Sequence, residues 1–334
     1  MKLSVRNIVL FAVNLLLILG FVLCCVLYHS LAGKLLAQTA AQRWRGGSEV
    51  PYTQVSVFRP KSDALRYQDI YSIRKGIDKA LVAVSLDPEA NDMLTADAFC
   101  AIGDIAVSSA KTKSAQTTLY AIGGDFFVFH PLHLESGSYI SERDLNNDLV
   151  VIDRELSWTL FGSVDSVGLT LTVDGRDYIV AGVVSRDDDF FTEQVDQTVS
   201  AIYMPFAAVY DYEEAVITSY ETAMPNPVEN FALDTVKNLA SNGEFVENSE
   251  RFTLGNVSEL IFSFGKRAIS ASGIACPPWE NAARLCEDYL ALTVVFAAIF
   301  LAMPVVCAVI LAIRAYKALR ATGRRVASRI REKY

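Results

Sequence analysis

The sequence predicts an α+β extracytoplasmic domain of two subdomains that is inserted between two transmembrane α-helices. Two stretches of this 334-residue chain contain no acidic or basic residue, and each is long enough to cross a bilayer. Between them, alternating β-branched runs and amphipathic helical patterns follow one another in the mixed order that is typical of α+β proteins. Basic residues flank the far ends of both apolar stretches, which indicates that the region between them lies across the membrane from the termini.

The first apolar stretch, IVLFAVNLLLILGFVLCCVLY, predicts transmembrane helix 1 over residues 8–30, after a cytoplasmic N-terminus of residues 1–7. About 20 helical residues span the hydrocarbon core of a bilayer. A cleaved signal peptide is the alternative, because Ser30 to Ala32 offer a cleavage site, but the apolar core is longer than the roughly 7 to 15 residues of such signals. The helical pattern continues beyond the membrane, so we expect helix 1 to extend as a stalk to about Trp44.

The second apolar stretch predicts transmembrane helix 2 over residues 289–313, and Pro304 should kink it by removing a backbone hydrogen bond. A basic tail at residues 314–334 follows, and basic residues are retained in the cytoplasm. Its basic residues, against the single acid Glu332, are Arg314, Lys317, Arg320, Arg324, Arg325, Arg329, Arg331 and Lys333. We therefore expect two cytoplasmic termini, and we expect residues 31–288 to form the extracytoplasmic domain with its helical stalk.

Two features of the membrane segments have alternative explanations. The amide of Asn14 is unfavourable in hydrocarbon unless it is satisfied, so it either faces a neighbouring helix or bonds to its own backbone. The basic tail either anchors the chain at an anionic lipid surface or docks a cytoplasmic ATPase. The formal charge of the whole chain is -8 although both flanks are basic, so the outer region is strongly acidic and binding to nucleic acid is not expected.

The first half of the outer region shows a strand, a helix and two further strands. Residues 52–58, YTQVSVF, alternate and are rich in β-branched side chains, which predicts a strand. An amphipathic helix is expected next, with Ser62 or Asp63 as its cap, and its apolar face comprises Leu65, Ile70, Ile73 and Ile77. Strands near residues 98–107 and 117–122 complete this half.

The second half begins with the strand LVVID at residues 149–153, whose last residue, Asp153, can cap a helix that starts at Arg154. Gly162 supplies the stop, and Asp174-Gly175 between two alternating runs is a strong hairpin signal. Further strands are predicted at 201–206, 216–223 and 245–252, with helices at 227–240 and 257–271.

Several patterns suggest chemistry, but none is complete enough to assign a site. The Ser-x-x-Lys pattern occurs at Ser72/Lys75, Ser108/Lys111 and Ser263/Lys266, without the companion motifs of penicillin-recognising enzymes. HPLHLE, with His130, His133 and Glu135, contains too few ligands for a metal, and RDDDFF at 186–191 lacks the spacing of a calcium loop. No Walker-type phosphate loop occurs. We therefore predict no catalytic, cofactor-binding or metal-binding residues, no cofactor, and no enzyme activity.

The six cysteines divide between the two compartments. Cys24, Cys25 and Cys307 fall in the predicted membrane helices, where a thiol behaves as a small apolar side chain. Cys100 and the pair Cys276 and Cys286 fall outside, where oxidation can occur. Cys276 and Cys286 flank the start of helix 2, so they either form a local disulfide or remain two thiols.

The stretch LHLESGSYISERDL, followed by LVVIDRELSWTLFGSVDSVGLTLTVDGRDYIVAGVV, resembles the signature of the MacB-like periplasmic core domain. IYMPF resembles a later strand of the family, and the resemblance is specific over residues 132–206. Ser166 stands where the family usually has proline. The matching residues are Gly137, Tyr139, Leu160, Phe161, Gly162, Asp165, Val167, Gly168, Gly175, Val180, Gly182 and Val183.

The resemblance implies a permease-like subunit of the MacB/FtsX ABC transporter superfamily in the plasma (inner) membrane. Such a subunit would couple a cytoplasmic ABC ATPase to the extracytoplasmic domain, in transport or in mechanotransmission. Permeases of this superfamily usually have two further membrane helices, so we expect either a further permease subunit in a homo- or hetero-oligomer or a two-helix accessory protein. The alternative function is a stand-alone membrane-anchored receptor or scaffold that binds an outer ligand or protein partner.

Overall fold

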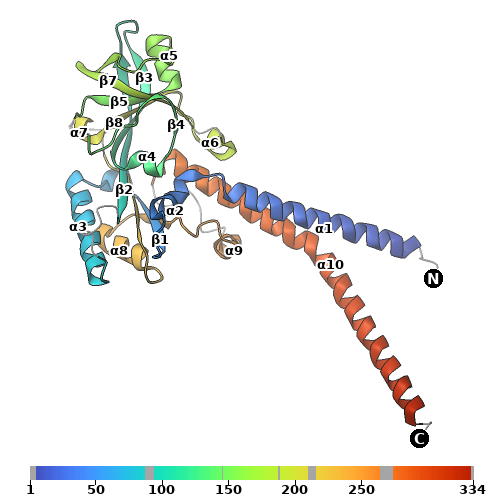
Figure 1. Cartoon of the computed structure of the whole chain (residues 1–334). Helices are drawn as coiled ribbons and strands as arrows, with labels where there is room; N and C mark the ends of the chain where they lie inside the picture. Colours follow the sequence, from blue (N-terminus) through green and yellow to red (C-terminus); the bar gives the residue numbers. More distant parts are fainter. Residues whose placement is uncertain are drawn as a thin grey trace. The chain divides into compact units, whose positions relative to one another are not determined.

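The computed structural model describes residues 5–86, 94–144, 146–186, 189–209, 216–263 and 274–331 (Figure 1). The chain forms two compact units. One comprises Met1–Gly33 together with Asp288–Tyr334, and we call it the helical unit. The other comprises Lys34–Glu287, and we call it the outer unit. The two units are described separately below.

One mixed β-sheet organises the outer unit, and its strands are hydrogen-bonded in the order β10-β1-β9-β2-β3-β8-β5-β7-β4, with β6 pairing with β2 and β7. Only β3 with β8 and β5 with β7 are parallel, among the strand pairs described. The strands are β1 (Tyr52–Phe58), β2 (Ala96–Ser108), β3 (Ala115–Gly124), β4 (His133–Gly137), β5 (Leu149–Asp153), β6 (Thr170–Val173), β7 (Arg176–Ser185), β8 (Ala201–Pro205), β9 (Ser219–Pro225) and β10 (Glu244–Glu247).

Alternate residues of the central strands point to opposite sides of this sheet, so both faces carry apolar side chains. Helices cover both faces. On one face, Phe99 and Ile202 pack with α3 (Tyr67–Ala83), α5 (Arg154–Phe161), α7 (Phe206–Val209) and α8 (Phe231–Ala240). On the other face, Cys100 and Tyr203 pack with α2 (Ala40–Arg45), α4 (Phe126–Phe129) and Trp279 at the start of α10 (Pro278–Arg331). The segments that lead from and to the helical unit therefore share one face of the sheet.

The two subdomains predicted for the outer region are not separate compact units, because one sheet runs through a single outer unit. In Figure 1, α3 and α8 lie side by side near β1, whereas α5 lies near β3 and β7 at the other end. The long strands β2 and β3 join the ends, which share one sheet within one compact unit. The α+β class predicted from the sequence is confirmed.

The helix and hairpin predicted around the family signature are present. The Asp153 carboxylate accepts a hydrogen bond from the Leu156 backbone N–H at 2.8 Å, and Gly162 ends α5 in the left-handed conformation with φ +71°. Asp174 and Gly175 both have positive φ, as a tight two-residue hairpin turn requires. Ser166, at the position where proline is usual, is buried and lies 2.7 Å from the hydroxyl of Ser157.

The predicted cap of the helix after β1 is wrong. Lys61–Asp63 form a separate 3₁₀ turn, η2, and α3 begins at Tyr67 with Arg66 as its cap residue. The carboxylate of Asp69 accepts hydrogen bonds from the backbone N–H and the side chain of Arg66. The N-terminus of α3 is therefore capped by a residue of its own first turn. The register of the apolar face is correct, because Ile70, Ile73 and Ile77 are buried.

Three later boundaries also differ from the prediction. The helix predicted from residue 227 begins only at Phe231, because Asn230 before it has a positive φ of 62°. The strand β10 ends at Glu247 instead of continuing to residue 252, since Asn248 and Arg251 turn inward to make buried polar contacts. The last outer helix, α9, spans Leu254–Ser263, and the rest of the predicted 257–271 helix lies partly outside the described residues.

The helical unit contains most of the two helices that are long and apolar enough to cross a membrane. These are α1 (Val5–Ala32) and α10 (Pro278–Arg331), which contains Pro304 and which Figure 1 shows as a bent helix. Both explanations offered for Asn14 hold, since its side-chain N–H₂ donates to the Leu10 carbonyl at 2.8 Å and lies 3.6 Å from Cys307 Sγ on α10.

The predicted continuous stalk after helix 1 is wrong. The helix ends at Ala32, Leu35 is extended and buried, and the chain resumes as a 3₁₀ turn, η1 (Leu36–Thr39), before α2. The physical reason lies on β1, where the buried amide of Gln54 donates to the Ala37 carbonyl and accepts from the Ala40 N–H. These bonds hold the segment against the sheet in a conformation that a straight helix cannot adopt. The uninterrupted helix is α10 instead, with 54 residues.

Candidate coupling site

The first ten residues of α10, from Pro278 to Glu287, belong to the outer unit, although the same helix continues into the helical unit. Proline is favoured at the first position of a helix because its missing N–H would lack an intrahelical partner there. Glu280 in the first turn lies where the helix dipole favours an acid. We call the contacts that this segment makes within the outer unit the candidate coupling site.

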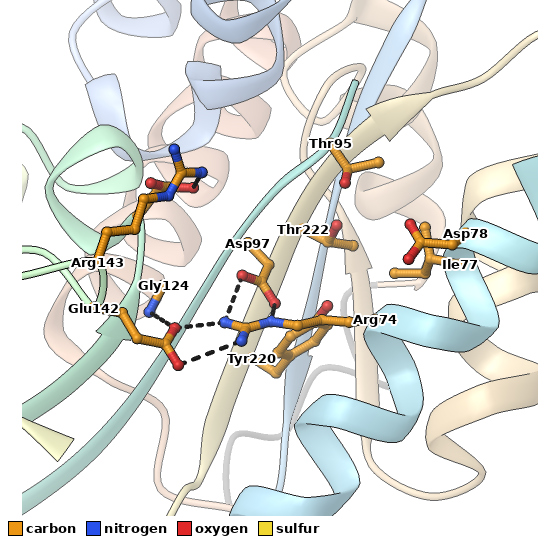
Figure 2. A pocket seen from close by; sticks show the side chains of 11 residues that line it. Arg74, Ile77, Asp78, Thr95, Asp97, Gly124, Glu142, Arg143, Tyr220 and Thr222 are labelled. Carbon is orange, nitrogen blue, oxygen red and sulfur yellow. Dashed lines mark hydrogen bonds and ion pairs between the residues drawn. The ribbon is translucent and has the colours of Figure 1, made fainter. Parts of the chain in front are cut away.

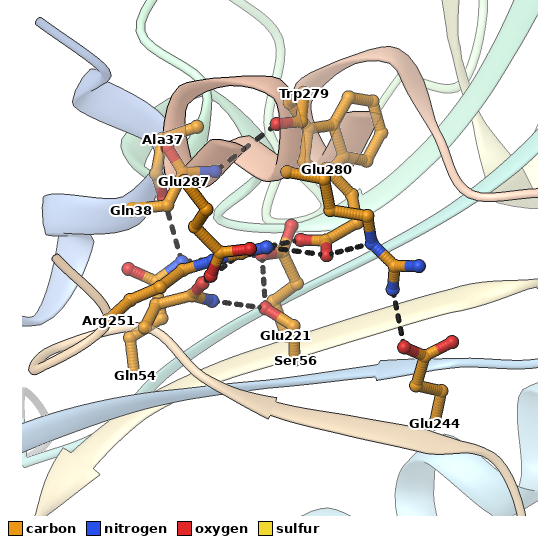
Figure 3. Close-up of polar contacts among 12 residues, drawn as sticks. Ala37, Gln38, Gln54, Ser56, Glu221, Glu244, Arg251, Trp279, Glu280 and Glu287 are labelled. Atoms are coloured by element: carbon orange, nitrogen blue, oxygen red, sulfur yellow. Dashed lines mark hydrogen bonds and ion pairs between the residues drawn. The ribbon is translucent and has the colours of Figure 1, made fainter. Parts of the chain in front are cut away.

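Arg251, which lies between β10 and α9, holds this helix start through a buried ion-pair cluster (Figure 3). Its two terminal nitrogens donate to the two carboxylate oxygens of Glu280 at 2.7 and 2.9 Å, and its Nε donates to Glu287 at 2.6 Å. All three residues are less than 10% exposed. Glu280 and Glu287 are seven residues apart, so they lie on the same face of α10. One guanidinium therefore fixes two turns of the helix at once.

Arg251 and Glu280 stay charged at neutral pH. Burial by itself would raise the pKa of Glu280, but the neighbouring Arg251 and Arg284 outweigh it and lower that pKa. Burial likewise lowers the pKa of Arg251, and the two carboxylates more than reverse that effect. A buried charge without a partner is strongly unfavourable, so removing one member of the cluster leaves the others unstable.

Arg284 extends the ion-pair cluster to the edge of the sheet. Its Nε donates to Glu280 at 2.7 Å, and its Nη2 donates to Glu244 of β10 at 2.6 Å (Figure 3). Asn248 accepts a hydrogen bond from Arg251 at 3.1 Å and donates to the buried Ser56 hydroxyl of β1 at 2.7 Å. The start of α10 is thereby connected to both β10 and β1.

A second set of contacts surrounds Glu221, which is buried on β9. Its carboxylate accepts from the Ser56 hydroxyl at 2.7 Å and from the Gln54 amide at 3.3 Å, and its other oxygen lies 2.6 Å from His130 Nε2. The His130 ring in turn packs against Trp279 of α10, with 4.1 Å between the ring centroids. Polar contacts thus run from α4 across β9 and β1 to Arg251.

The chain that enters the outer unit meets the chain that leaves it at the same place. The Gln38 side chain of η1 donates to the Trp279 carbonyl at 3.3 Å, and Gln54 holds residues on both sides of Gln38 (Figure 3). Both connections are therefore attached to the same strand of the sheet and to each other. The first turns of α10 are therefore held to the sheet through side chains of β1 and β10.

The two Ser-x-x-Lys patterns that lie wholly within the described residues are not brought into catalytic geometry. On α3, the Ser72 hydroxyl donates to a backbone carbonyl in its own helix, and Lys75 lies over the ring of Tyr71. The Ser108 hydroxyl donates to the Thr172 carbonyl, and Lys111 donates to the Phe161 carbonyl. Lys266 lies outside the described residues.

The residues considered as metal ligands are also separated. His130 is buried against Glu221, His133 is exposed on β4, and Glu135 forms an ion pair with Arg154. Asp187 and Asp188 of the acidic loop lie outside the described residues, whereas Asp189 caps α6 (Phe190–Val195). Over the part of the chain that the structure describes, no three His, Cys, Asp or Glu side chains are grouped to hold a metal ion.

No disulfide joins Cys276 and Cys286, so the second of the two expectations for this pair holds in this structure. Burial raises the pKa of Cys276 to about 11 and that of Cys286 to about 12. Both thiols are therefore protonated and weakly nucleophilic at neutral pH.

Sequence reasoning did not identify the residues of the coupling site. Arg251 lies in an ordinary polar stretch, SERFTL, that gives no indication of burial. The one available signal was the spacing of Glu280 and Glu287, two acids on one helix face directly before an apolar stretch.

Comparison with known proteins places residues 29–235 in the family described as the MacB-like periplasmic core domain. The macrolide export ATP-binding/permease protein MacB of Neisseria gonorrhoeae is 31% identical over 94 residues, which cover 28% of this chain and 14% of that protein. MacB 2 of Aeromonas hydrophila is 28% identical over 101 residues, which cover 30% of this chain and 15% of the relative. The matched region is thus a small part of these curated relatives.

Two solved structures are similar to part of this chain. The periplasmic region of MacB from Actinobacillus actinomycetemcomitans is 20% identical, with a TM-score of 0.38 over 58% of this chain and 87% of the other. The extracellular domain of the transporter YknZ from Gram-positive bacteria is 13% identical, with a TM-score of 0.40 over 59% and 98% of the two chains. The family match covers more than half of the sequence, and this chain belongs to the MacB-like periplasmic core domain family.

Proposed function

We propose that this protein is a permease-like subunit of an ABC-type transporter or mechanotransmission complex, and that it couples a cytoplasmic ATPase to its outer unit. The carrying observation is the buried ion-pair cluster of Arg251 with Glu280 and Glu287, which fixes the outer end of a continuous, membrane-competent helix to the sheet. A displacement of α10 would therefore reach the sheet without passing through a flexible joint.

The family membership supports the same proposal. The matched relatives are named as ATP-binding/permease proteins for macrolide export, which is stated of those proteins only. In this chain, no Walker-type phosphate loop occurs in the sequence, so we propose that ATP hydrolysis is supplied by a separate subunit. The outer unit would face the periplasm or the cell exterior, with both basic ends in the cytoplasm.

Copurification tests this function directly. The full chain, tagged at its C-terminus and extracted from native membranes in a mild detergent, should retain a subunit with a Walker motif and nucleotide-stimulated ATP hydrolysis. A further permease subunit in the same complex would supply additional membrane helices. A stable complex that contains no nucleotide-binding subunit would instead favour the receptor or scaffold function and would contradict the proposal.

A further inference from the structure

The helix α9 carries an apolar stripe that the outer unit covers only in part. Leu254, Ile261 and Phe262 have the i, i+7 and i+8 spacing that places side chains along one side of a helix. Val257, in the same stripe, is fully buried, so the middle of α9 packs on the outer unit. Leu254 is nevertheless 61% exposed, and Phe262 is 92% exposed, more than any other large apolar side chain in the described part of the chain. Both ends of the stripe are therefore left open.

The opposite side of α9 is polar. Glu259 is the only ionisable residue of the helix, and it is exposed five positions after Leu254, away from the stripe. Asn256 lies on the same polar side as Glu259 and is also exposed. The helix is therefore amphipathic, as are helices that lie at the boundary between water and hydrocarbon.

Contacts within the outer unit hold the start of α9 close to the apolar stretch of α10. Asn256 Nδ2 donates to the Glu250 carbonyl at 2.8 Å. The next residue, Arg251, donates through Nε to Glu287 at 2.6 Å. Tyr289, the first residue of the stretch without acids or bases, follows Glu287 by two positions, or about 3 Å along the helix axis. The start of α9 is thus held beside the point where α10 becomes apolar.

We propose that α9 binds the surface of the lipid bilayer into which α10 inserts. Leu254, Ile261 and Phe262 lie among the headgroups and upper acyl chains, and Glu259 remains in water. The apolar face of such a helix typically enters this boundary by about 5–10 Å. A bilayer is the partner because the ion pair of Arg251 with Glu287 holds α9 beside the outer end of a membrane-competent helix. The inference rests on the proposed membrane topology.

The opposite face of the sheet supplies a control surface. Trp279 of α10 packs on one face, whereas α3 packs on the other. There α3 borders a cavity of about 340 Å³ with polar lining, in which Arg74 donates to Asp97 and Glu142 (Figure 2). Tyr71 of α3 is an aromatic residue that is 56% exposed. We expect it to remain in water when α9 contacts lipid.

Quenching by brominated lipids tests the contact in the full chain. Phe262→Trp and Tyr71→Trp are reconstituted in phosphatidylcholine bilayers that are brominated either near the headgroup end or near the methyl end of the acyl chains. The emission of the wild type, which contains Trp44, Trp158 and Trp279, is subtracted. The added tryptophan of Phe262→Trp should lose most of its emission, and more with the shallow bromine than with the deep one. The added tryptophan of Tyr71→Trp should lose none.

Three results would overturn the proposal. They are an absence of quenching in Phe262→Trp, equal quenching in Phe262→Trp and Tyr71→Trp, and a blue shift in Phe262→Trp without quenching. The last result would indicate that a protein partner, such as a second copy of this chain, covers α9 instead of lipid.

Phe296→Trp separates failure of this inference from failure of the membrane topology. Phe296 lies in the apolar stretch of α10 and is 52% exposed. Quenching in Phe296→Trp without quenching in Phe262→Trp would leave α10 in the bilayer and overturn only the contact of α9. Absence of quenching in both variants would overturn the topology as well.

A second substitution in the Phe262→Trp protein tests the orientation of α9. Leu254→Glu should abolish most of the quenching, because a charged side chain is unfavourable among acyl chains. Glu259→Gln, on the polar side, should leave the quenching unchanged. Both positions are exposed, so thermal unfolding of the two proteins should be the same. Equal quenching in the two proteins would contradict the proposed orientation.

Discussion

Arg251 shows how a single side chain can join two parts of a protein that are separated by composition. It lies in the polar outer region, yet it is 6% exposed and forms three short contacts with the carboxylates of Glu280 and Glu287. Arginine suits this position because its planar fork binds one carboxylate through two parallel hydrogen bonds and still presents its Nε to another. Lysine could satisfy only part of this arrangement.

Removing one carboxylate from the ion-pair cluster should destabilise the outer unit. We expect Glu280→Gln to lower the free energy of unfolding by about 3 kcal/mol, because Arg251 and Arg284 lose their shared buried counter-ion. Chemical denaturation of the full chain in detergent measures the change. Glu259→Gln on the exposed face of α9 is the control and should change it by less than about 0.5 kcal/mol. Equal stability of the two variants would contradict a structural role for the cluster.

Asp153 should make stability depend on pH in the direction opposite to most paired acids. Burial raises its folded pKa to about 7, above the unfolded value of about 3.9. The folded state therefore binds more protons between these values, and the free energy of unfolding should fall as the pH rises from about 4 to about 7. Asp153→Asn keeps an oxygen that can accept from the Leu156 N–H and should remove this slope. Chemical denaturation at several pH values measures how the free energy of unfolding changes with pH. The same change in the wild type and in Asp153→Asn would contradict the raised pKa of Asp153.

At the scale of elements, the sequence correctly predicted the features that depend only on residues close together in the chain. The Asp153 cap, the Gly162 stop and the Asp174-Gly175 turn depend on residues within a few positions of one another, and all three are confirmed. The prediction of a continuous stalk was wrong because contacts with a residue distant in the sequence interrupt the helix. Gln54 takes the backbone groups of Ala37 and Ala40, and no helical propensity in the stalk sequence reveals that competition.

The contact between α1 and α10 within the helical unit can be tested by cross-linking. The Asn14 Nδ2 and Cys307 Sγ atoms are 3.6 Å apart, so Asn14→Cys should form a disulfide with Cys307 on mild oxidation. The background should lack Cys24 and Cys25, and Leu16→Cys, on an exposed face of α1, is the control. Proteolysis of the outer region followed by a non-reducing gel shows whether the helices remain linked. Equal cross-linking of both cysteines would contradict this packing.

A second variant probes the same interface by size. A Cβ atom added at Gly20 would lie 3.1 Å from the ring of Phe300, which is tighter than ordinary contact. Gly20→Leu should therefore separate the helices and reduce the Asn14→Cys cross-link, and Phe300→Ala should restore part of it.

At the scale of the whole molecule, the sequence predicted the class, the two apolar helices and the family, but not the coupling site. The class, the apolar helices and the family can be predicted from periodicity, composition and motifs, because each of these is a property of contiguous sequence. The coupling site joins residues near 38, 54, 130, 221, 251 and 280, and the ion-pair cluster of Arg251 lies beyond the matched family region at 29–235. Only folding of the sheet brings these residues together.

The proposed topology makes a simple prediction for intact cells. The C-terminal tail, which is rich in arginine and lysine, should be protected from added trypsin until the membrane is permeabilised, because basic flanks are retained in the cytoplasm. A C-terminal epitope reports the cleavage on a blot. Loss of the epitope from intact spheroplasts would place the tail outside and would reverse the assigned orientation.

We propose that α10 carries motion into the outer unit through a continuous helix held by Arg251. Hydrogen–deuterium exchange of the copurified complex, with and without ATP and vanadate, tests it in three proteins: the wild type, a Gly-Gly-Ser insertion between Asp288 and Tyr289, and the same insertion between Gly33 and Lys34. We expect a nucleotide-dependent change in exchange at β10 that survives the insertion after Gly33 and is lost with the insertion in α10, while ATP hydrolysis continues in all three proteins. An unchanged response in the α10 insertion variant would contradict it.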